Sequence, residues 1–163
     1  MNKITLFLVM YPLIGGSVMA AELKTNSVTA KLCGSWKLIA LEGYGETLEP
    51  EESIMRISCK DGMVQMQKQS LTRTLTLDGK TRSSMPDMGM AEAALILQDQ
   101  LIVAAERESA VASQSSIEQW SVQPESGHLV QVRRVYWDRK NGSRGEIVQR
   151  RVWERVAACK EVE

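Results

Sequence analysis

Three methionines within six residues form the densest group of potential metal ligands in the chain. Met85, Met88 and Met90 follow the spacing M-x-x-M-x-M, in a segment that also holds Pro86 and Gly89. Thioether sulfur is a soft ligand that suits Cu(I), so three such side chains on one loop could form a copper site. Methionine also fills irregular gaps between apolar groups, because its side chain is flexible. Packing is the favoured interpretation, and copper binding stays an alternative.

Candidate catalytic residues are few. The single histidine, His128, lies in a turn-like sequence after Gly127, and no G-x-S-x-G nucleophile motif accompanies it. A Ser-His-Asp or Cys-His site would have to use this one imidazole as its base. No acid/base pair with a recognisable spacing is present. We therefore predict that the protein is not an enzyme, and no cofactor is implied.

Arginine is concentrated in residues 133–155, which carry seven arginines. The adjacent pairs Arg133-Arg134 and Arg150-Arg151 would each place one guanidinium on either face of a strand, because successive side chains alternate. A guanidinium that faces inward costs several kcal/mol unless it is paired. An inward arginine is therefore either the partner of an acidic side chain or an anion site.

Charge and composition exclude two common partners. The chain has 20 Lys and Arg residues against 20 Asp and Glu residues. A balanced chain is not suited to general binding of nucleic acids or anionic membranes. Residues 42–52 are acidic, with no basic residue among them, and they could face the arginine-rich 133–155 segment or water.

The elements that must position these side chains are predicted to be strands. Leu71 to Leu77 alternates apolar and polar residues and ends at Asp78-Gly79, which is typical of a β-hairpin. Residues 80–92 suggest a longer loop, and Ser109 to Ser116 a weak strand or a loop. Ala91 to Leu97 has some helical character, so one short helix is allowed there. Further short strands are predicted at 36–41, 54–59, 64–68, 93–97, 101–105, 118–122, 128–137 and 146–156.

The first twenty residues have the pattern of a secretory signal peptide. Lys3 precedes an apolar run over residues 4–18, and Val18-Met19-Ala20 offers small residues for cleavage. The run is too short and too interrupted for a membrane span. We predict a signal peptide at 1–20, a domain at 21–163, and export to the periplasm or the extracellular space.

Two short motifs stand at opposite ends of the predicted strands. Cys33-Gly34-Ser35-Trp36 opens the first strand, and Arg151-Val152-Trp153-Glu154-Arg155 lies in the last. This combination resembles the lipocalin and fatty-acid-binding-protein group of small β-barrels. The resemblance implies an all-β fold: a single antiparallel lipocalin-like barrel of about eight to ten strands, with the first and last strands as neighbours.

The same resemblance assigns roles to particular residues. Trp36, preceded by Gly34, would close one end of the barrel beneath Arg155 or Arg151, because a guanidinium stacks on an indole face. In fatty-acid-binding proteins an R-x-Tyr on the last strand holds a ligand carboxylate. Arg151 and Trp153 occupy that spacing here, and Arg134 and Tyr136 repeat it one strand earlier.

Tryptophan side chains, Trp120 among them, could line an apolar ligand cavity or fill a solid core. The interior of an eight-stranded barrel is only just wide enough for side chains or for one small ligand. The sequence leaves these two alternatives open.

The chain contains three cysteines, Cys33, Cys59 and Cys159. In an oxidising compartment we expect one disulfide and one remaining thiol, or an intermolecular bond. If the lipocalin-like fold holds, all three lie toward the same end. The favoured bridge then joins Cys33 to Cys159, before the first strand and after the last.

The function predicted from these observations is binding. We expect an exported lipocalin-like protein that carries a small apolar or amphipathic ligand, with Arg134 or Arg151 as anchor for an acidic group. The alternative is a protein-binding barrel, an inhibitor or envelope assembly factor, that uses the acidic 42–52 loop or the 109–116 loop. Copper binding through Met85, Met88 and Met90 is third.

Overall fold

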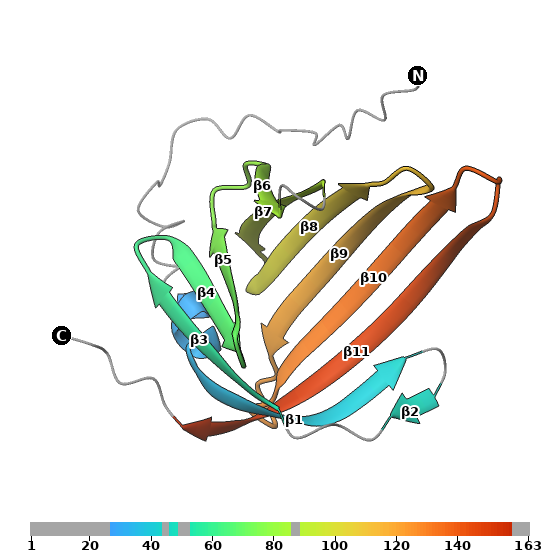
Figure 1. Ribbon diagram of the computed structural model, residues 1–163. Helices are drawn as coiled ribbons and strands as arrows, with labels where there is room; N and C mark the ends of the chain where they lie inside the picture. Colours follow the sequence, from blue (N-terminus) through green and yellow to red (C-terminus); the bar gives the residue numbers. More distant parts are fainter. Residues whose placement is uncertain (1–26, 44–45, 49–52, 86–88, 158–163) are drawn as a thin grey trace.

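The protein is described here by a computed structural model, which places residues 27–43, 46–48, 53–85 and 89–157. The described chain contains a helical turn at 27–32 and a single antiparallel sheet (Figure 1). The strands are β1 (Gly34–Gly43), β2 (Glu46–Leu48), β3 (Ile54–Lys60), β4 (Met63–Lys68), β5 (Leu71–Thr76), β6 (Arg82–Met85), β7 (Met90–Leu97), β8 (Gln100–Glu108), β9 (Ala112–Val122), β10 (Leu129–Arg139) and β11 (Arg144–Ala157).

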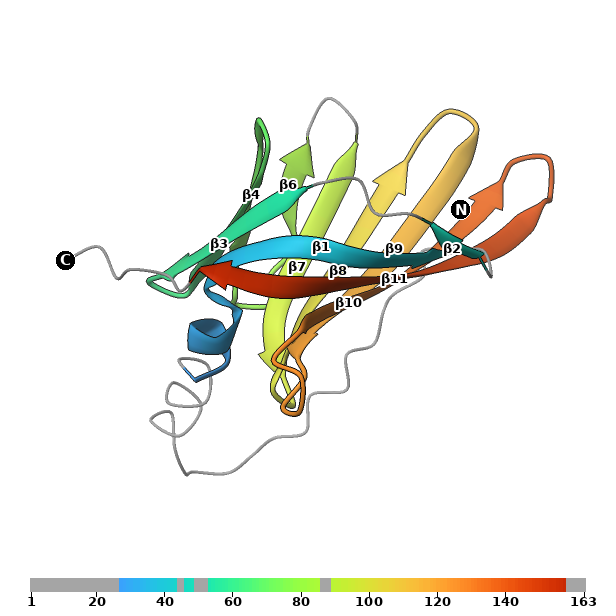
Figure 2. The same cartoon turned by 90° about the horizontal axis from the view of Figure 1, so that it is seen from below.

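The sheet curls into a half-barrel in which the first and last long strands are neighbours. The strand order is β5-β4-β3-β1-β11-β10-β9-β8-β7-β6, and β2 pairs with β1 outside this path. Figure 2 shows β1 in blue running beside β11 in red. The prediction of an all-β antiparallel fold is confirmed, and the pairing of β1 with β11 is the arrangement that the lipocalin resemblance implies.

The two Asp-Gly sequences behave differently. Asp61 (φ 51°) and Gly62 (φ 72°) form the tight turn between β3 and β4, as left-handed conformations at both positions favour. The predicted hairpin at Asp78-Gly79 is wrong, because β5 pairs with β4 and β6 pairs with β7. There the Asp78 carboxylate accepts hydrogen bonds from Arg82, and the Gly79 N–H donates to the Ala94 carbonyl of β7 at 2.9 Å.

The strand predicted at 93–97 is confirmed, and the short helix that the sequence allows at Ala91 to Leu97 does not form. These residues lie in β7, where the ladder to β8 overrides the helical preference of alanine. The helical turn lies instead at 27–32. The segment predicted as a loop at 80–92 includes β6, and most of 109–116 belongs to β9.

One end of the barrel, which we call the Trp36 end, is filled by apolar side chains. Strand alternation sends every second residue inward, and the inward positions here carry large apolar groups. The largest fully buried side chains are those of Trp36, Leu32, Ile57, Leu75, Leu101, Leu129, Val64 and Val103.

Trp36 contacts both the helical turn and Arg155 of β11 at this end. Its indole Nε1 donates to the Leu32 carbonyl of the helical turn at 2.8 Å, and the ring is fully buried. The guanidinium of Arg155 lies 4.1 Å from the ring centroid. Arg155 also donates to the Cys33 carbonyl at 2.6 Å and to the Lys31 carbonyl at 2.5 Å. One arginine of β11 thus joins the last strand to the segment that precedes β1.

Two cysteines lie near the helical turn. The Cys59 thiol donates to the Thr29 carbonyl at 3.3 Å, and the Cys33 N–H donates to the same carbonyl at 2.9 Å. Neither thiol forms a disulfide within the described chain. Cys159 lies outside the described residues, so the Cys33–Cys159 bridge stays a prediction, as does the signal peptide at 1–20.

Candidate functional site

Polar side chains occupy the barrel interior immediately above the apolar end. On β9, alternation places Glu118 on the same face as Trp120, and both are buried. On β10 the corresponding inward residue is Gln131, which is 3 % exposed, and on β11 it is Arg151, the register partner of Gln131. Three neighbouring strands therefore direct polar groups toward one region of the interior.

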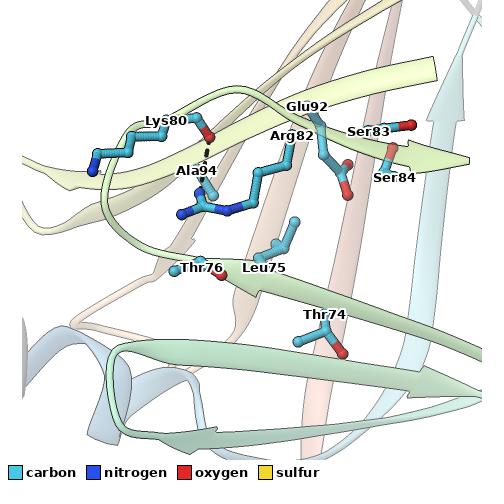
Figure 3. Close-up of a pocket in the computed structure, with 9 residues that line it drawn as sticks. All are labelled: Thr74, Leu75, Thr76, Lys80, Arg82, Ser83, Ser84, Glu92 and Ala94. Carbon is cyan, nitrogen blue, oxygen red and sulfur yellow. Dashed lines mark hydrogen bonds between the residues drawn. The ribbon is translucent and has the colours of Figure 1, made fainter. Parts of the chain in front are cut away.

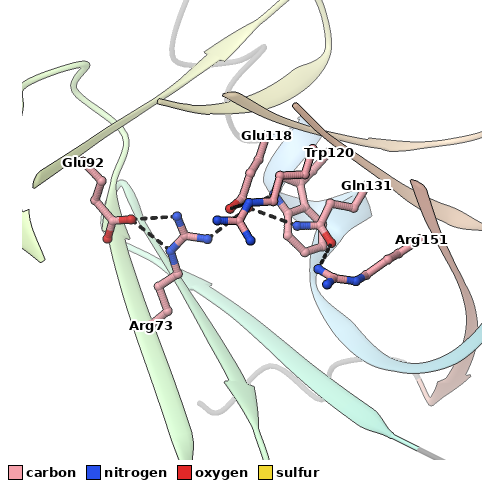
Figure 4. Close-up of polar contacts among 7 residues, drawn as sticks. Arg73, Glu92, Glu118, Trp120, Gln131 and Arg151 are labelled. Carbon is pink, nitrogen blue, oxygen red and sulfur yellow. Dashed lines mark hydrogen bonds and ion pairs between the residues drawn. The ribbon is translucent and has the colours of Figure 1, made fainter. Parts of the chain in front are cut away.

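Glu118 is the centre of this network, and Figure 4 shows its contacts. Its Oε2 accepts hydrogen bonds from the Arg73 guanidinium at 3.0 Å, the Trp120 indole at 3.2 Å and the Gln131 amide at 3.1 Å. Its Oε1 lies 3.6 Å from Nε of Arg133. A buried carboxylate with this many donors is fully satisfied, as a buried charge must be.

Arg73 reaches the network from the far side of the barrel. It lies on β5, and its guanidinium bridges Glu92 of β7 at 2.6 Å and Glu118 of β9 at 3.0 Å. Burial by itself would lower the pKa of Arg73, but the charge of Glu118 and hydrogen bonds to Glu92 outweigh it, so the pKa is raised. Arg73 therefore stays charged and connects strands that share no ladder.

Arg151 has no such carboxylate partner. Its guanidinium donates to the neutral amide oxygen of Gln131 at 3.1 Å, and within the described chain no acidic side chain forms an ion pair with it. Burial lowers the pKa of Arg151, the like charge of Arg133 lowers it further, and Glu118 offsets part of the effect. A guanidinium nevertheless stays protonated in proteins, so a positive charge is held here in a poorly solvated place.

The interior has more hydrogen-bond donors than acceptors. Within the described chain, Nε of Arg133 and the indole Nε1 of Trp153 are buried and have no hydrogen-bond acceptor. The network's three guanidiniums, on Arg73, Arg133 and Arg151, face two carboxylates. A buried donor without an acceptor costs about 1–3 kcal/mol. The described interior therefore carries an excess of positive charge and of buried donors.

A small pocket opens beside this network, between the two ends of the sheet (Figure 3). It has a volume of about 90 Å³ and is lined by residues of β5, β6 and β7, among them Leu75, Ser84 and Glu92. Glu92 belongs both to the pocket wall and to the Arg73 bridge. The pocket is smaller than the roughly 150 Å³ cavity that accommodates benzene in a well-studied engineered protein.

Three arginines outside the interior network form ion pairs. Arg134 pairs with Glu146 at 3.2 Å, Arg144 with Asp138 at 2.9 Å, and Arg150 with Glu42 at 3.0 Å. The arginine-rich 133–155 segment and the start of the acidic 42–52 segment thus meet on the outer surface.

The structure divides the residues predicted to bind a ligand into two groups. Trp120, Arg151 and Trp153 lie in the interior, Trp120 and Trp153 being almost fully buried. Arg134 and Tyr136 lie on the outer face, with the Arg134 side chain 52 % exposed and Tyr136 41 % exposed. The second Arg-x-aromatic repeat therefore takes no part in the interior network.

Only part of the methionine motif lies within the described residues. Met85 and Met90 are register partners in the β6–β7 ladder, and Met88 lies outside the described residues. Among the described residues, no group of three or more His, Cys, Asp or Glu side chains is placed to hold a metal ion. In the same part of the chain, no helix has the length and apolar character needed to cross a membrane.

No protein-family model matches the chain, and no curated protein matches it in sequence. Among solved structures, the chain is similar to the fluorescent protein UnaG, wild type, with a TM-score of 0.49 and 15% identity over 77% of this chain and 98% of that one. A point mutant of UnaG gives a TM-score of 0.48 and 14% identity over 77% and 96% of the two chains. A likeness at this level says nothing about what the present chain binds.

Proposed function

We propose that this chain is an exported binding protein whose barrel interior holds a small amphipathic molecule, with an acidic group of that molecule at Arg151. The observation that supports this most directly is the charge of the interior. Arg151 is half-buried, bonded only to a neutral amide among the described side chains, and close enough to Arg133 for the two like charges to repel. An anionic group would give Arg151 a charged partner and would offset its repulsion with Arg133.

The donors around Arg151 favour an oxygen-rich anion over a neutral or cationic group. Among the described residues, nothing accepts a hydrogen bond from the buried Nε of Arg133 or from the indole Nε1 of Trp153. A carboxylate, sulfonate or phosphate offers several acceptor oxygens and one or two negative charges. A cation would add to the positive charge that is already present.

The apolar part of the ligand is expected toward the end opposite Trp36, where the turns at 109–111 and 140–143 lie. The Trp36 end is packed solid with apolar side chains. On the inward face of β10, the positions that follow Arg133 are Val135 and Trp137. The Trp137 ring lies directly over Gly145 of β11, where any side chain would collide with it. These groups offer an apolar wall next to the charged network.

The test compares two fluorescent probes that differ by one anionic group. 8-Anilinonaphthalene-1-sulfonate carries a sulfonate, and N-phenyl-1-naphthylamine has the same ring systems without it. We expect wild type to bind the sulfonate probe more tightly. Arg151→Met should weaken that binding about 10- to 100-fold, the value of a lost charge-assisted hydrogen bond, and leave the neutral probe nearly unchanged.

The control is Arg134→Met, which removes an arginine from the outer face and should leave both Kd values unchanged. Arg151→Met should unfold at the same or a higher urea concentration than wild type, because it removes a partly buried charge that lacks a partner. Equal binding of the sulfonate probe by wild type and Arg151→Met would contradict the proposal. Native mass spectrometry of protein from its own host's envelope would then identify the ligand class.

A further inference from the structure

The wall of the barrel has one place without a backbone ladder. β5 and β6 are the two ends of the sheet, and within the described chain no ladder joins β5 to β6 or to β7. At one end of this seam, the Gly79 N–H donates to the Ala94 carbonyl at 2.9 Å. The other neighbouring strands of the described sheet are joined by antiparallel ladders, with register shifts in β1–β11 and β6–β7. The seam is therefore the part of the wall that opens with the fewest broken backbone hydrogen bonds.

The main side-chain contact across this seam is made by Arg73. From β5 its Nε and Nη2 donate to Oε2 of Glu92 on β7 at 3.1 and 2.6 Å. Its Nη1 donates to Glu118 of β9 at 3.0 Å. The Glu92 side chain is only 7 % exposed, and that of Arg73 is 26 % exposed. One guanidinium thus holds the two ends of the sheet together and also contacts the centre of the interior network.

The pocket of about 90 Å³ lies in this same seam. Thr74, Leu75 and Thr76 of β5 form one side, and Ser84 of β6 and Glu92 of β7 form the other. Glu92 thus belongs both to the pocket wall and to the contact with Arg73, and Arg73 in turn contacts Glu118.

We propose that the seam between β5 and the β6–β7 hairpin is the route by which the ligand reaches the interior. In this proposal Arg73 is the positioning residue that closes the route by binding Glu92. The inference rests on the proposed function, because it assigns the entrance of the same interior site. It breaks no ladder between neighbouring strands, and it requires the separation of the Arg73–Glu92 ion pair and widening of the pocket beside it.

The variant that tests this proposal must open the seam without changing the interior charge. The double substitution Arg73→Met with Glu92→Gln removes one positive and one negative charge, so the net charge that an anionic probe meets is preserved. The matched control, Arg134→Met with Glu146→Gln, removes an ion pair of the same kind between β10 and β11 on the outer face.

Stopped-flow fluorescence with 8-anilinonaphthalene-1-sulfonate gives the rates. We expect association and dissociation to accelerate together in the seam variant, each by roughly tenfold, because a partly buried charged contact no longer opposes opening. Their ratio gives the Kd, which separates any change in the interior site from the change in the rates. The control should keep the wild-type rates. Arg73→Lys keeps the charge but reaches a single carboxylate. Its association and dissociation rates should lie between those of wild type and of the double variant.

A second readout is independent of any ligand. Amide hydrogen exchange should become faster in Leu71–Thr76 and Met90–Leu97 of the seam variant, and stay unchanged in the β10–β11 ladder. If wild type binds the probe and the seam variant exchanges it at wild-type rates, the route is overturned and the proposed function stands. If wild type does not bind the probe, the proposed function fails and the route fails with it. Should the double variant not fold, Arg73→Lys decides between the same outcomes.

Discussion

The two halves of the barrel interior are built on the same strands and differ in chemistry. On β9, Trp120 belongs to the apolar cluster at the Trp36 end, while Glu118, two residues away on the same face, is the centre of the polar network. The apolar half packs without charged groups among its fully buried side chains, whereas the polar half holds more cations than anions. In the function that we propose, one half supplies stability, and the other is less stable because its excess of positive charge serves to bind an anionic group.

Trp36→Ala should cause the largest loss of stability, because it disrupts the packing of the apolar half. The substitution leaves a cavity beneath Arg155 and removes the hydrogen bond to the Leu32 carbonyl. We expect a loss of about 3–5 kcal/mol in the free energy of unfolding, as for other buried tryptophans. Urea denaturation followed by circular dichroism measures it. A loss no greater than that of a surface substitution would mean that this end is not the stabilising half.

Glu118→Gln should cause the second-largest loss of stability, because it removes the charge at the centre of the polar half. The amide cannot neutralise Arg73 and Arg133, and one of its donors would face those guanidiniums. A loss of about 2–3 kcal/mol is expected, below the full value for a buried pair because both arginines are partly solvated. Thermal unfolding in low and high salt measures it, with Glu146→Gln on the outer face as the control. A stable variant would show that the network contributes little to folding.

Arg155→Met tests how the Trp36 end is sealed, with a smaller expected effect. The substitution removes the cation–π contact and the hydrogen bonds to the Cys33 and Lys31 carbonyls, but keeps an apolar chain over the indole. We expect a loss of about 1 kcal/mol, because the guanidinium is exposed. Chemical denaturation gives the energy. The Trp36 emission maximum should also shift to the red, and an unchanged spectrum would argue against the stacking.

Arg134→Ala should have the smallest effect. Its ion pair with Glu146 lies in solvent on the outer face, and exposed pairs contribute less than about 1 kcal/mol. A double-mutant cycle with Glu146→Ala at two salt concentrations measures the coupling. A coupling energy as large as that of the Arg73–Glu118 pair would remove the distinction between the outer face and the polar interior.

Much of the fold was predictable because strand alternation and tight turns are local. Leu71 to Leu77 shows the alternation in the sequence, and β5 occupies Leu71–Thr76. The same local pattern misleads at Asp78-Gly79, which resembles Asp61-Gly62 in composition. The difference comes from contacts made elsewhere: the Gly79 N–H reaches the Ala94 carbonyl of β7, so the chain crosses the seam instead of turning back.

The candidate site was only partly predictable. Arg151, Trp120 and Trp153 were proposed from motif spacing and aromatic content, but spacing does not reveal which Arg-x-aromatic repeat faces inward, and Arg134 with Tyr136 faces out. Glu92, Glu118 and Arg73 were missed. Arg73 and Glu118 are 45 residues apart, and only the curl of the sheet brings them together. The position of Glu118 two residues before Trp120 was the available sign that it shares an inward face.

The ladder between β1 and β11 has a consequence for how the protein is made. β1 is the first strand to leave the ribosome, and the strand that carries Arg155 is the last of those described. Arg155 can therefore cover Trp36 only after most of the chain has been synthesised. Such distant pairing slows folding. A chain interrupted before residue 144 would leave one edge of β1 unprotected and prone to aggregation. The Trp36 end thus closes only after β11 has joined β1.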